Sequence, residues 1–208
     1  MRGNILSKYY TRYHQEKGRI GFSWVESERA DYFKNWIGKG KRILDIGCRD
    51  GTLTRHYCSG NEVVGVDIDL NALKHCKEEL TVPLFCADVN DIFPFSAGLF
   101  DVVVLAEVLE HTIFPEVVIS EIDRILKKGG LFVGSTPNAF RLKNRIKFLL
   151  GQDFEVDKTH LHHFSLRGLR KLLEERFSEV VLLPVSSRFL FLSKKLFGNS
   201  ILWKCYKR

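Results

Sequence analysis

The stretch "RILDIGCRDG", residues 42–51, joins a short apolar run to a turn that contains two glycines. The run "RILDIG" predicts a buried β-strand, because it is short, apolar and bounded by glycine. Gly47 and Gly51 then fall in the turn before a helix, which we expect over residues 51–58. Glycine tolerates unusual backbone dihedral angles and lets a ligand lie close to the backbone. The stretch therefore predicts a strand, a ligand-binding turn and a helix in direct succession.

Downstream of this stretch, short β-rich runs alternate with segments of helical periodicity. The segment "PEVVISEIDRILKKGG" repeats its apolar residues every 3.6 positions and ends at Gly-Gly, as a helix does. Strands that alternate with helices favour a mainly parallel, doubly wound sheet that is covered on both faces. The expected strands are 42–47, 62–68, 82–88, 99–106 and 129–137, and a helix over 70–80 follows the second of them.

The C-terminal part begins with a polar loop after residue 151, and "SLRGLRKLLEERF" then predicts a helix over 165–177 that Ser165 opens. We expect residues 179–185 and 201–208 to be the last two strands, an antiparallel hairpin-like pair around a short helix. The predicted fold class is α/β. It is a Rossmann-like, doubly wound, seven-stranded and mainly parallel sheet with an antiparallel edge strand, plus N-terminal helices.

The size and composition of the chain suit one compact domain, because 45% of the 208 residues are hydrophobic. No stretch approaches the roughly 18 apolar residues that a membrane span needs. The first residues, "MRGNILSKYY", lack an apolar core and a small-residue cleavage site, so we expect no secretion signal. Five cysteines without a C-x-x-C pair favour reduced thiols, and hence a cytoplasmic protein, over a disulfide framework or a zinc site.

Positive charge gathers in two segments of the chain, whose net charge is +7. Residues 138–151 carry four basic residues and no acid. Residues 186–208 carry six basic residues, among them Arg188, and again no acid. Both segments interleave these charges with large apolar residues. This pattern fits either an anionic partner or a solvated basic surface.

Acidic residues close the next two predicted strands, with Asp67 at the end of "VVGVD" and Asp88 at the end of "FCAD". In a doubly wound sheet, ligands bind at the carboxyl ends of the strands, near the point where the strand order reverses. A carboxylate at Asp67 can accept hydrogen bonds from both hydroxyls of a ribose. The stretch "GCRDG" does not supply the dinucleotide fingerprint G-x-G-x-x-G, so a nicotinamide-binding Rossmann domain is disfavoured. Acidic strand ends have no purpose in packing, so a domain without a cofactor is also disfavoured.

At these motifs the sequence resembles the class I S-adenosylmethionine-dependent methyltransferases, over about residues 41–185. The motifs are "LDIGCRDG", "VVGVDID", "FCADV", "FDVVVLAEVLEH" and "LKKGGLFVGSTPN". The resemblance implies a cofactor site for S-adenosylmethionine. It places Asp45, Gly47, Cys48 and Gly51 around the methionine part, Asp67 at the ribose with Ile68 beside the adenine, Asp88 and Val89 at the adenine, and Ala106 at the sulfonium.

The chain is expected to form a single domain of residues 1–208 with four parts. Residues 1–38 would form an N-terminal helical cap, and 41–137 the cofactor-binding core. Residues 138–164 would be an insertion on the acceptor side, and 165–208 the C-terminal helix and last strands. One departure from the family is Arg49, which stands where a middle glycine is common. Arginine at positive φ would be strained, and we expect its side chain to point out to solvent.

The stretch "AEVLEHT" sets Glu107, Glu110 and His111 at the i, i+3 and i+4 spacing of one helix face. A second polar cluster, "KTHLHHFS", brings His160, His162 and His163 into the loop before the 165–177 helix. The two stretches together resemble the small-RNA 2′-O-methyltransferases, and ubiquinone-type O-methyltransferases are similar in the same regions.

The small-RNA resemblance implies a divalent cation, Mg²⁺ or Mn²⁺, on Glu107, Glu110, His111 and His162. Two carboxylates and two imidazoles suit such an ion. The alternative is a helix start in which the glutamate caps the helix or contacts the cofactor region and His111 lines the acceptor pocket. In either case His111 and His160 are the candidate catalytic residues, since an oxygen nucleophile benefits from a base or a metal that lowers its pKa.

The predicted activity is therefore O-methylation, with an acceptor enclosed by residues 1–38 and 138–164. Tyr9, Tyr10, Tyr13 and His14 are expected to contribute from the first segment, and Phe140, Arg141 and Arg145 from the second. The basic segment fits a phosphate-bearing acceptor or a peripheral membrane contact, or a helix that extends its charges over its own core. The expected acceptor is a small molecule, lipid-linked or glycan-related. The alternatives are RNA, although no added RNA-binding domain is evident, and a cofactor-binding regulatory subunit without catalysis.

Overall fold

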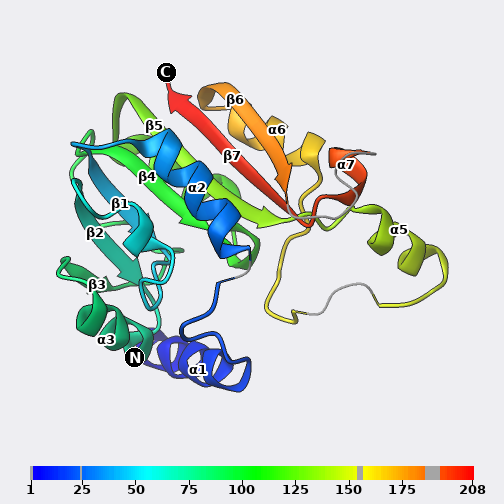
Figure 1. The fold of residues 1–208 in the computed structure, drawn as a ribbon, viewed down its shortest axis with the longest axis horizontal. Coiled ribbons are helices and arrows are strands. Elements are labelled where there is room, and N and C mark those ends of the chain that lie inside the picture. Colours follow the sequence, from blue (N-terminus) through cyan, green and yellow to red (C-terminus); the bar gives the residue numbers. More distant parts are fainter. Residues whose placement is uncertain (1, 24, 154–156, 186–192) are drawn as a thin grey trace.

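The computed structural model describes residues 2–23, 25–153, 157–185 and 193–208. Their seven strands form one mixed sheet in the order β3-β2-β1-β4-β5-β7-β6 (Figure 1). Strands β1 to β5 are parallel, and β7 runs antiparallel to both of its neighbours. The strands are β1 Arg42–Ile46, β2 Glu62–Asp67, β3 Leu84–Cys86, β4 Phe100–Ala106, β5 Leu126–Pro137, β6 Phe177–Val185 and β7 Ser200–Lys207. The predicted fold class is confirmed. The antiparallel strand, β7, lies next to the edge strand β6 and not at the edge itself.

The predicted C-terminal pair of strands is also confirmed. Strands β6 and β7 are antiparallel, and the short helix α7, Lys194–Phe197, lies between them in the chain. Gly134 of β5 lies opposite Trp203 of β7, and a Cβ atom on it would come within 2.2 Å of the indole ring. The absence of that atom lets the two strands bury a tryptophan between them. Arg188 of the basic tail lies outside the described residues.

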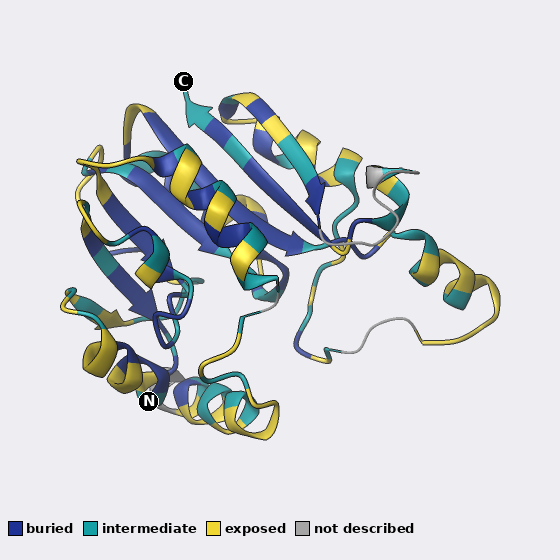
Figure 2. Ribbon diagram, in the orientation of Figure 1, coloured by how far each residue is buried: buried dark blue, intermediate teal, exposed yellow. Residues whose placement is uncertain are grey.

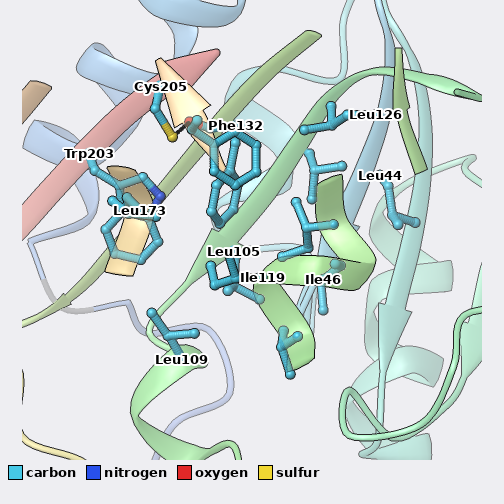
Figure 3. Packing of buried hydrophobic residues seen from close by; sticks show 14 of the residues in the cluster. Leu44, Ile46, Leu105, Leu109, Ile119, Leu126, Phe132, Leu173, Trp203 and Cys205 are labelled. Atoms are coloured by element: carbon cyan, nitrogen blue, oxygen red, sulfur yellow. Dashed lines mark hydrogen bonds between the residues drawn. The ribbon is translucent and has the colours of Figure 1, made fainter. Parts of the chain in front are cut away.

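Helices cover both faces of the sheet because side chains of its strands alternate between two apolar clusters. On one face, α2 (Glu26–Ile37) buries Phe33 and Ile37 against a cluster that includes Ile43 of β1. On the other face, α4 (Pro115–Ile125) and α6 (Leu166–Glu174) pack on a cluster that includes Leu44 and Phe132. Figure 2 shows the buried strands between these layers, and Figure 3 shows Leu173 of α6 beside Phe132 and Trp203.

Two predicted helix boundaries were wrong. The helix expected over 51–58 is only a short 3₁₀ turn, η1, Thr54–His56. The hydroxyls of Thr54 and Tyr57 both donate to the buried carboxylate of Asp45, which holds this segment in a tight turn. The helix expected to end at Gly-Gly stops at Ile125, and β5 begins at the next residue.

The remaining helices lie around the carboxyl ends of the strands. Helix α3, Leu70–Glu79, is capped by Asp69, the residue before it. The Asp69 carboxylate accepts hydrogen bonds from two backbone N–H groups of the first turn. Helix α1, Arg2–Glu16, contacts α3 and lies apart from the sheet, so the expected cap 1–38 is divided between α1 and the sheet-packed α2 (Figure 1). Helix α5, Leu142–Leu149, and the 3₁₀ turn η2, Leu109–His111, complete the set. Among the described residues, no helix is long and apolar enough to cross a membrane.

Candidate active site

A cavity of about 850 Å³ opens at the carboxyl ends of β1, β2 and β4, where a doubly wound sheet places its ligand. Its walls come from both segments that were expected to enclose an acceptor. Residues of α1 and of the loop 157–161 face the strand ends across it. The size lies within the range of about 300–1,000 Å³ that small-molecule sites occupy.

The glycine turn after β1 forms the floor of the cavity. Gly47 has φ +79°, and a Cβ atom there would lie 2.2 Å from the Cγ2 atom of Val108. Gly51 has φ +78°, and its missing side chain leaves room for Cys76 and Leu80 of the α3 region. Gly51 does not itself line the cavity. Gly51 is thus a turn residue that lets the loop pack on α3, and its place in the cofactor site stays a prediction.

Asp45 and Cys48 line the cavity from the same loop, and both are buried. Asp45 accepts hydrogen bonds of 2.6 Å from the hydroxyls of Thr54 and Tyr57. Burial outweighs these hydrogen bonds and raises the pKa of Asp45 to about 6. This carboxylate therefore anchors the turn as well as facing the cavity.

The two acidic strand ends are on the cavity wall together with Ile68, Val89 and Ala106. The Asp67 carboxylate accepts the backbone N–H groups of Asp69 and Arg49, each at 2.8 Å. One oxygen of Asp88 accepts both the backbone and the side-chain amide of Asn90. A carboxylate has about four lone-pair sites, so Asp67 and Asp88 each retain capacity for a ligand.

The expectation that Arg49 points to solvent was wrong. Its φ is +51°, as the family departure suggested. Its Nε atom lies 3.2 Å from the Asp50 carboxylate, and its guanidinium also donates to the Phe22 carbonyl. The side chain is only 20% exposed because these contacts fold it against the segment that follows α1.

Glu107 does not join the other predicted metal ligands, because it contacts Ser135 and Arg29. The sequence did not mark Arg29 as a site residue. The Oε1 atom of Glu107 accepts the Ser135 hydroxyl at 2.8 Å and lies 3.3 Å from the buried guanidinium of Arg29. Arg29 also donates to Ser135 at 3.0 Å, and it lines the cavity from α2. In the sequence, Arg29 is one charge among several on an amphipathic helix, and no local signal marks it.

Glu110 and His111 come together with His160 on the acceptor side. One potential ligand atom from each of the three lies within 4.8 Å of the other two. Glu110 is buried, and its Oε2 atom accepts the Thr136 hydroxyl at 3.0 Å. Its Oε1 atom has no hydrogen-bond partner among the described residues. Burial, with Glu107 nearby, raises the pKa of Glu110 well above its usual value.

The two imidazoles of this cluster have different surroundings. The His111 and His160 rings are 4.7 Å apart, edge to face. Burial and the neighbouring His160 lower the pKa of His111 to about 4, so His111 is neutral at pH 7. Its Nδ1 atom lies 3.1 Å from the Thr159 carbonyl and 3.0 Å from the Thr159 hydroxyl.

The structure brings His160, and not His162, to Glu110 and His111. The Nε2 atom of His162 lies 3.3 Å from the backbone carbonyl of Ile113. The backbone N–H groups of Leu161 and His162 both donate to the Glu110 carbonyl. This pair of hydrogen bonds fixes the loop so that His160, two residues earlier, faces His111.

Asp157 is a second residue that the sequence analysis missed. Its Oδ2 atom accepts the Tyr13 hydroxyl and lies 3.8 Å from the Nε2 atom of His160. Its Oδ1 atom accepts the Thr159 hydroxyl at 2.6 Å. Burial opposes ionisation, but the hydrogen bonds from Thr159 and Tyr13 prevail and lower the pKa of Asp157 to about 2. The sequence signal that could have marked Asp157 is its position three residues before His160.

The other predicted acceptor residues divide into two groups. Tyr10, Tyr13, His14 and Arg141 line the cavity, whereas Tyr9, Phe140 and Arg145 do not. Tyr9 is 51% exposed on the outer side of α1. Arg145 donates to the Phe140 carbonyl at 2.7 Å, near the start of α5.

Relatives of this chain are methyltransferases. A family model described as a methyltransferase domain matches residues 23–181. The ubiquinone biosynthesis O-methyltransferase of Nitrosococcus oceani is 36% identical over 117 residues, which are 53% of this chain and 50% of that protein. The enzyme of the same name from Alkalilimnicola ehrlichii is 32% identical over 134 residues, 61% of this chain and 54% of that protein. The chain thus spans about half the length of these curated relatives.

The fold is similar to that of a solved S-adenosylmethionine-dependent methyltransferase from Archaeoglobus fulgidus. The TM-score is 0.74 at 20% identity, over 94% of this chain and 99% of that one. The family model covers well over half of the chain, and the predicted family is confirmed. This chain belongs to the methyltransferase-domain family and has the fold of the S-adenosylmethionine-dependent methyltransferases.

Proposed function

We propose that this chain transfers the methyl group of S-adenosylmethionine to a hydroxyl of an acceptor. The observation that carries the proposal is one cavity with two unlike walls. Strand-end carboxylates suited to a nucleoside form one wall, and a pair of histidines forms the other. Relatives named as O-methyltransferases, at 32–36% identity, support the choice of oxygen.

The residues of the first wall fit the cofactor. The Asp67 and Asp88 carboxylates keep lone pairs for ribose hydroxyls and an adenine amino group, and Ile68 and Val89 offer apolar contacts beside them. Gly47 lines the same cavity, where the methionine part would lie along its turn. Bound there, S-adenosylmethionine supplies a methyl group that is already activated. The main task of the chain is then to align the acceptor in line with it.

The histidines of the second wall provide base catalysis. His160 lies next to the Asp157 carboxylate, which can stabilise positive charge on its imidazole. His111 is neutral at pH 7 because burial lowers its pKa, and it can accept a hydrogen bond from the acceptor hydroxyl. We assign proton removal to His160, with His111 as its neighbour in the acceptor pocket.

A divalent cation on Glu110, His111 and His160 is the second candidate for activating the hydroxyl. It is favoured by the Glu110 Oε1 atom, which is buried and lacks a hydrogen-bond partner among the described residues. One carboxylate and two imidazoles suit Mn²⁺ better than Mg²⁺. Titration of Mn²⁺ alone into the protein, compared with Glu110→Gln, decides between a metal and a base. Binding that Glu110→Gln abolishes would assign the ion to this cluster.

The proposed acceptor is a small molecule, lipid-linked or glycan-related, with RNA as the alternative. The test is incubation with labelled S-adenosylmethionine and, separately, a lipid extract, a water-soluble metabolite extract and an RNA fraction. Label that enters an O-methyl group of a lipid or metabolite supports the proposal. Label in RNA supports the alternative. Cofactor binding without transfer to any fraction would indicate a cofactor-binding regulatory subunit and contradict the proposed catalysis.

A further inference from the structure

Helix α5 presents an apolar and basic surface that the described part of the chain leaves uncovered. None of its residues is classed as buried. The apolar side chains Phe148, Leu149 and Leu150 are 69%, 82% and 66% exposed. Figure 1 shows α5 extending away from the sheet, and Figure 2 shows exposed residues along it. We call Phe140, Ile146, Phe148, Leu149 and Leu150, with Arg141, Lys143, Arg145 and Lys147, the α5 surface.

The α5 surface has the pattern of a helix that lies in a membrane interface. Leu142, Ile146 and Leu149 share one face at helical spacing, and Lys143 and Arg145 flank that face. The stretch 138–152 contains no acidic residue. A short helix with large apolar residues and surrounding cations binds where acyl chains meet anionic headgroups.

The alternative, that α5 extends its charges over the core of its own chain, does not fit the structure. A helix of that kind buries an apolar stripe beneath the charges, and α5 buries no residue. Arg141, just before the helix, instead donates to the Asn199 side chain, and Arg145 donates to the Phe140 carbonyl. These contacts hold the base of the helix and leave its apolar end exposed.

We propose that the α5 surface docks on an anionic phospholipid bilayer. The inference rests on the proposed function in one respect, because it favours a lipid-linked acceptor. Arg141 and Asn144 lie at the base of α5 and also line the cavity. A helix that inserts its apolar face into the headgroup region thereby places the mouth of the cavity at the membrane, where a lipid-linked hydroxyl is found.

Charge and side-chain chemistry select a bilayer over other partners. Two copies of the α5 surface would bring cations against cations, which disfavours self-association. RNA would pair with the cations, but the leucines at positions 149 and 150 would remain in water. A bilayer accommodates both kinds of side chain.

The test measures co-flotation of the full chain with vesicles of phosphatidylcholine alone or mixed in equal parts with phosphatidylglycerol. We expect binding to the anionic vesicles, weakened by added salt. Lys143→Glu/Lys147→Glu should weaken it at least about tenfold. The matched control is Lys74→Glu/Lys77→Glu on the exposed side of α3, which makes the same charge change and should leave binding intact. None of these four lysines lines the cavity.

A second pair of variants tests the apolar face. Ile146→Ser/Leu149→Ser should reduce vesicle binding, whereas Ile92→Ser/Val117→Ser, on another exposed apolar patch, should not. Equal losses in test and control variants would overturn the proposal. So would the absence of vesicle binding, α5-dependent binding of an RNA oligonucleotide in its place, or self-association that the serine pair abolishes.

Calorimetry with S-adenosylmethionine separates this proposal from the proposed function. Vesicle binding without cofactor binding would contradict the methyltransferase assignment alone. Cofactor binding and methyl transfer without vesicle binding would contradict the membrane proposal alone.

Discussion

The two walls of the cavity differ in how far apart in the chain their contacts are made. On the cofactor wall, Asp67 bonds to Asp69 two residues away and to Arg49 eighteen residues away. On the acceptor wall, Tyr13 bonds to Asp157 across 144 positions, and His111 bonds to Thr159 across 48. The cofactor wall is therefore complete once the strands pair. The acceptor wall exists only when α1, η2 and the loop 157–161 dock together.

This difference predicts separable mutational effects. Changes on the cofactor wall should alter cofactor affinity and the stability of the sheet. Changes to the two histidines of the acceptor wall should alter turnover and leave cofactor affinity intact, because the strand-end carboxylates accept backbone N–H groups of their own loops. A variant on either wall that lowered both cofactor affinity and turnover would contradict this separation.

The largest expected effect is on turnover, from His160→Gln. Loss of a general base slows a reaction by about 10²–10⁴-fold, and the cofactor wall is untouched. His162→Gln is the matched control, since its ring faces the Ile113 carbonyl, and it should retain turnover. The measurement is label transfer to the acceptor, with cofactor affinity from calorimetry. Similar losses in both variants would show that the loop as a whole matters, and would contradict the assignment to His160.

The next effect is on the cofactor wall, from Gly47→Ala. The new methyl group would lie 2.2 Å from Val108 at a φ of +79°, so clash and backbone strain combine to cost about 2–4 kcal/mol of unfolding free energy. Gly98→Ala is the control, because its φ is +65° and a Cβ there meets no atom within 4 Å. It should cost about 1 kcal/mol from strain alone. Equal melting temperatures for the two variants would contradict the close contact with Val108.

The same contrast explains what the sequence could predict. The stretch from Arg42 to Gly51 encodes its strand and turn locally, and the motifs that end in Asp67 and Asp88 do the same for the next two strands. The fold class, the family and the cavity-lining strand ends followed from such local patterns. Arg29, Asp157 and the exchange of His162 for His160 depend on how distant segments dock, and no local pattern records that. The helix expected over 51–58 failed for a similar reason. Its hydroxyls bond to Asp45, a partner outside the periodic pattern.

A smaller effect is expected from Asp67→Ala, which removes the proposed ribose contact. Affinity for S-adenosylmethionine should fall by at least about tenfold, or roughly 1.4 kcal/mol. Asp101→Ala is the control, since Asp101 pairs with Lys127 at the other end of β4 and does not line the cavity. It should lower stability and spare cofactor affinity. Unchanged affinity in Asp67→Ala, measured by calorimetry, would remove Asp67 from the cofactor site.

The last expected effect is a pH dependence of opposite sign on the two walls. His111 titrates at about 4 when folded and 6.5 otherwise, so its contribution to stability is present above 6.5 and is lost as the pH falls toward 4. Asp45 titrates at about 6 when folded and 3.8 otherwise, so stability is gained as the pH falls through 6. Urea unfolding between pH 7 and pH 5 should show His111→Asn gaining about 2 kcal/mol relative to the wild type, and Asp45→Asn losing about 1 kcal/mol. The readout is the change of each difference with pH, because the hydrogen bonds lost in Asp45→Asn add a nearly constant offset. Parallel slopes for the two variants would contradict the idea that the walls respond to acid in opposite directions.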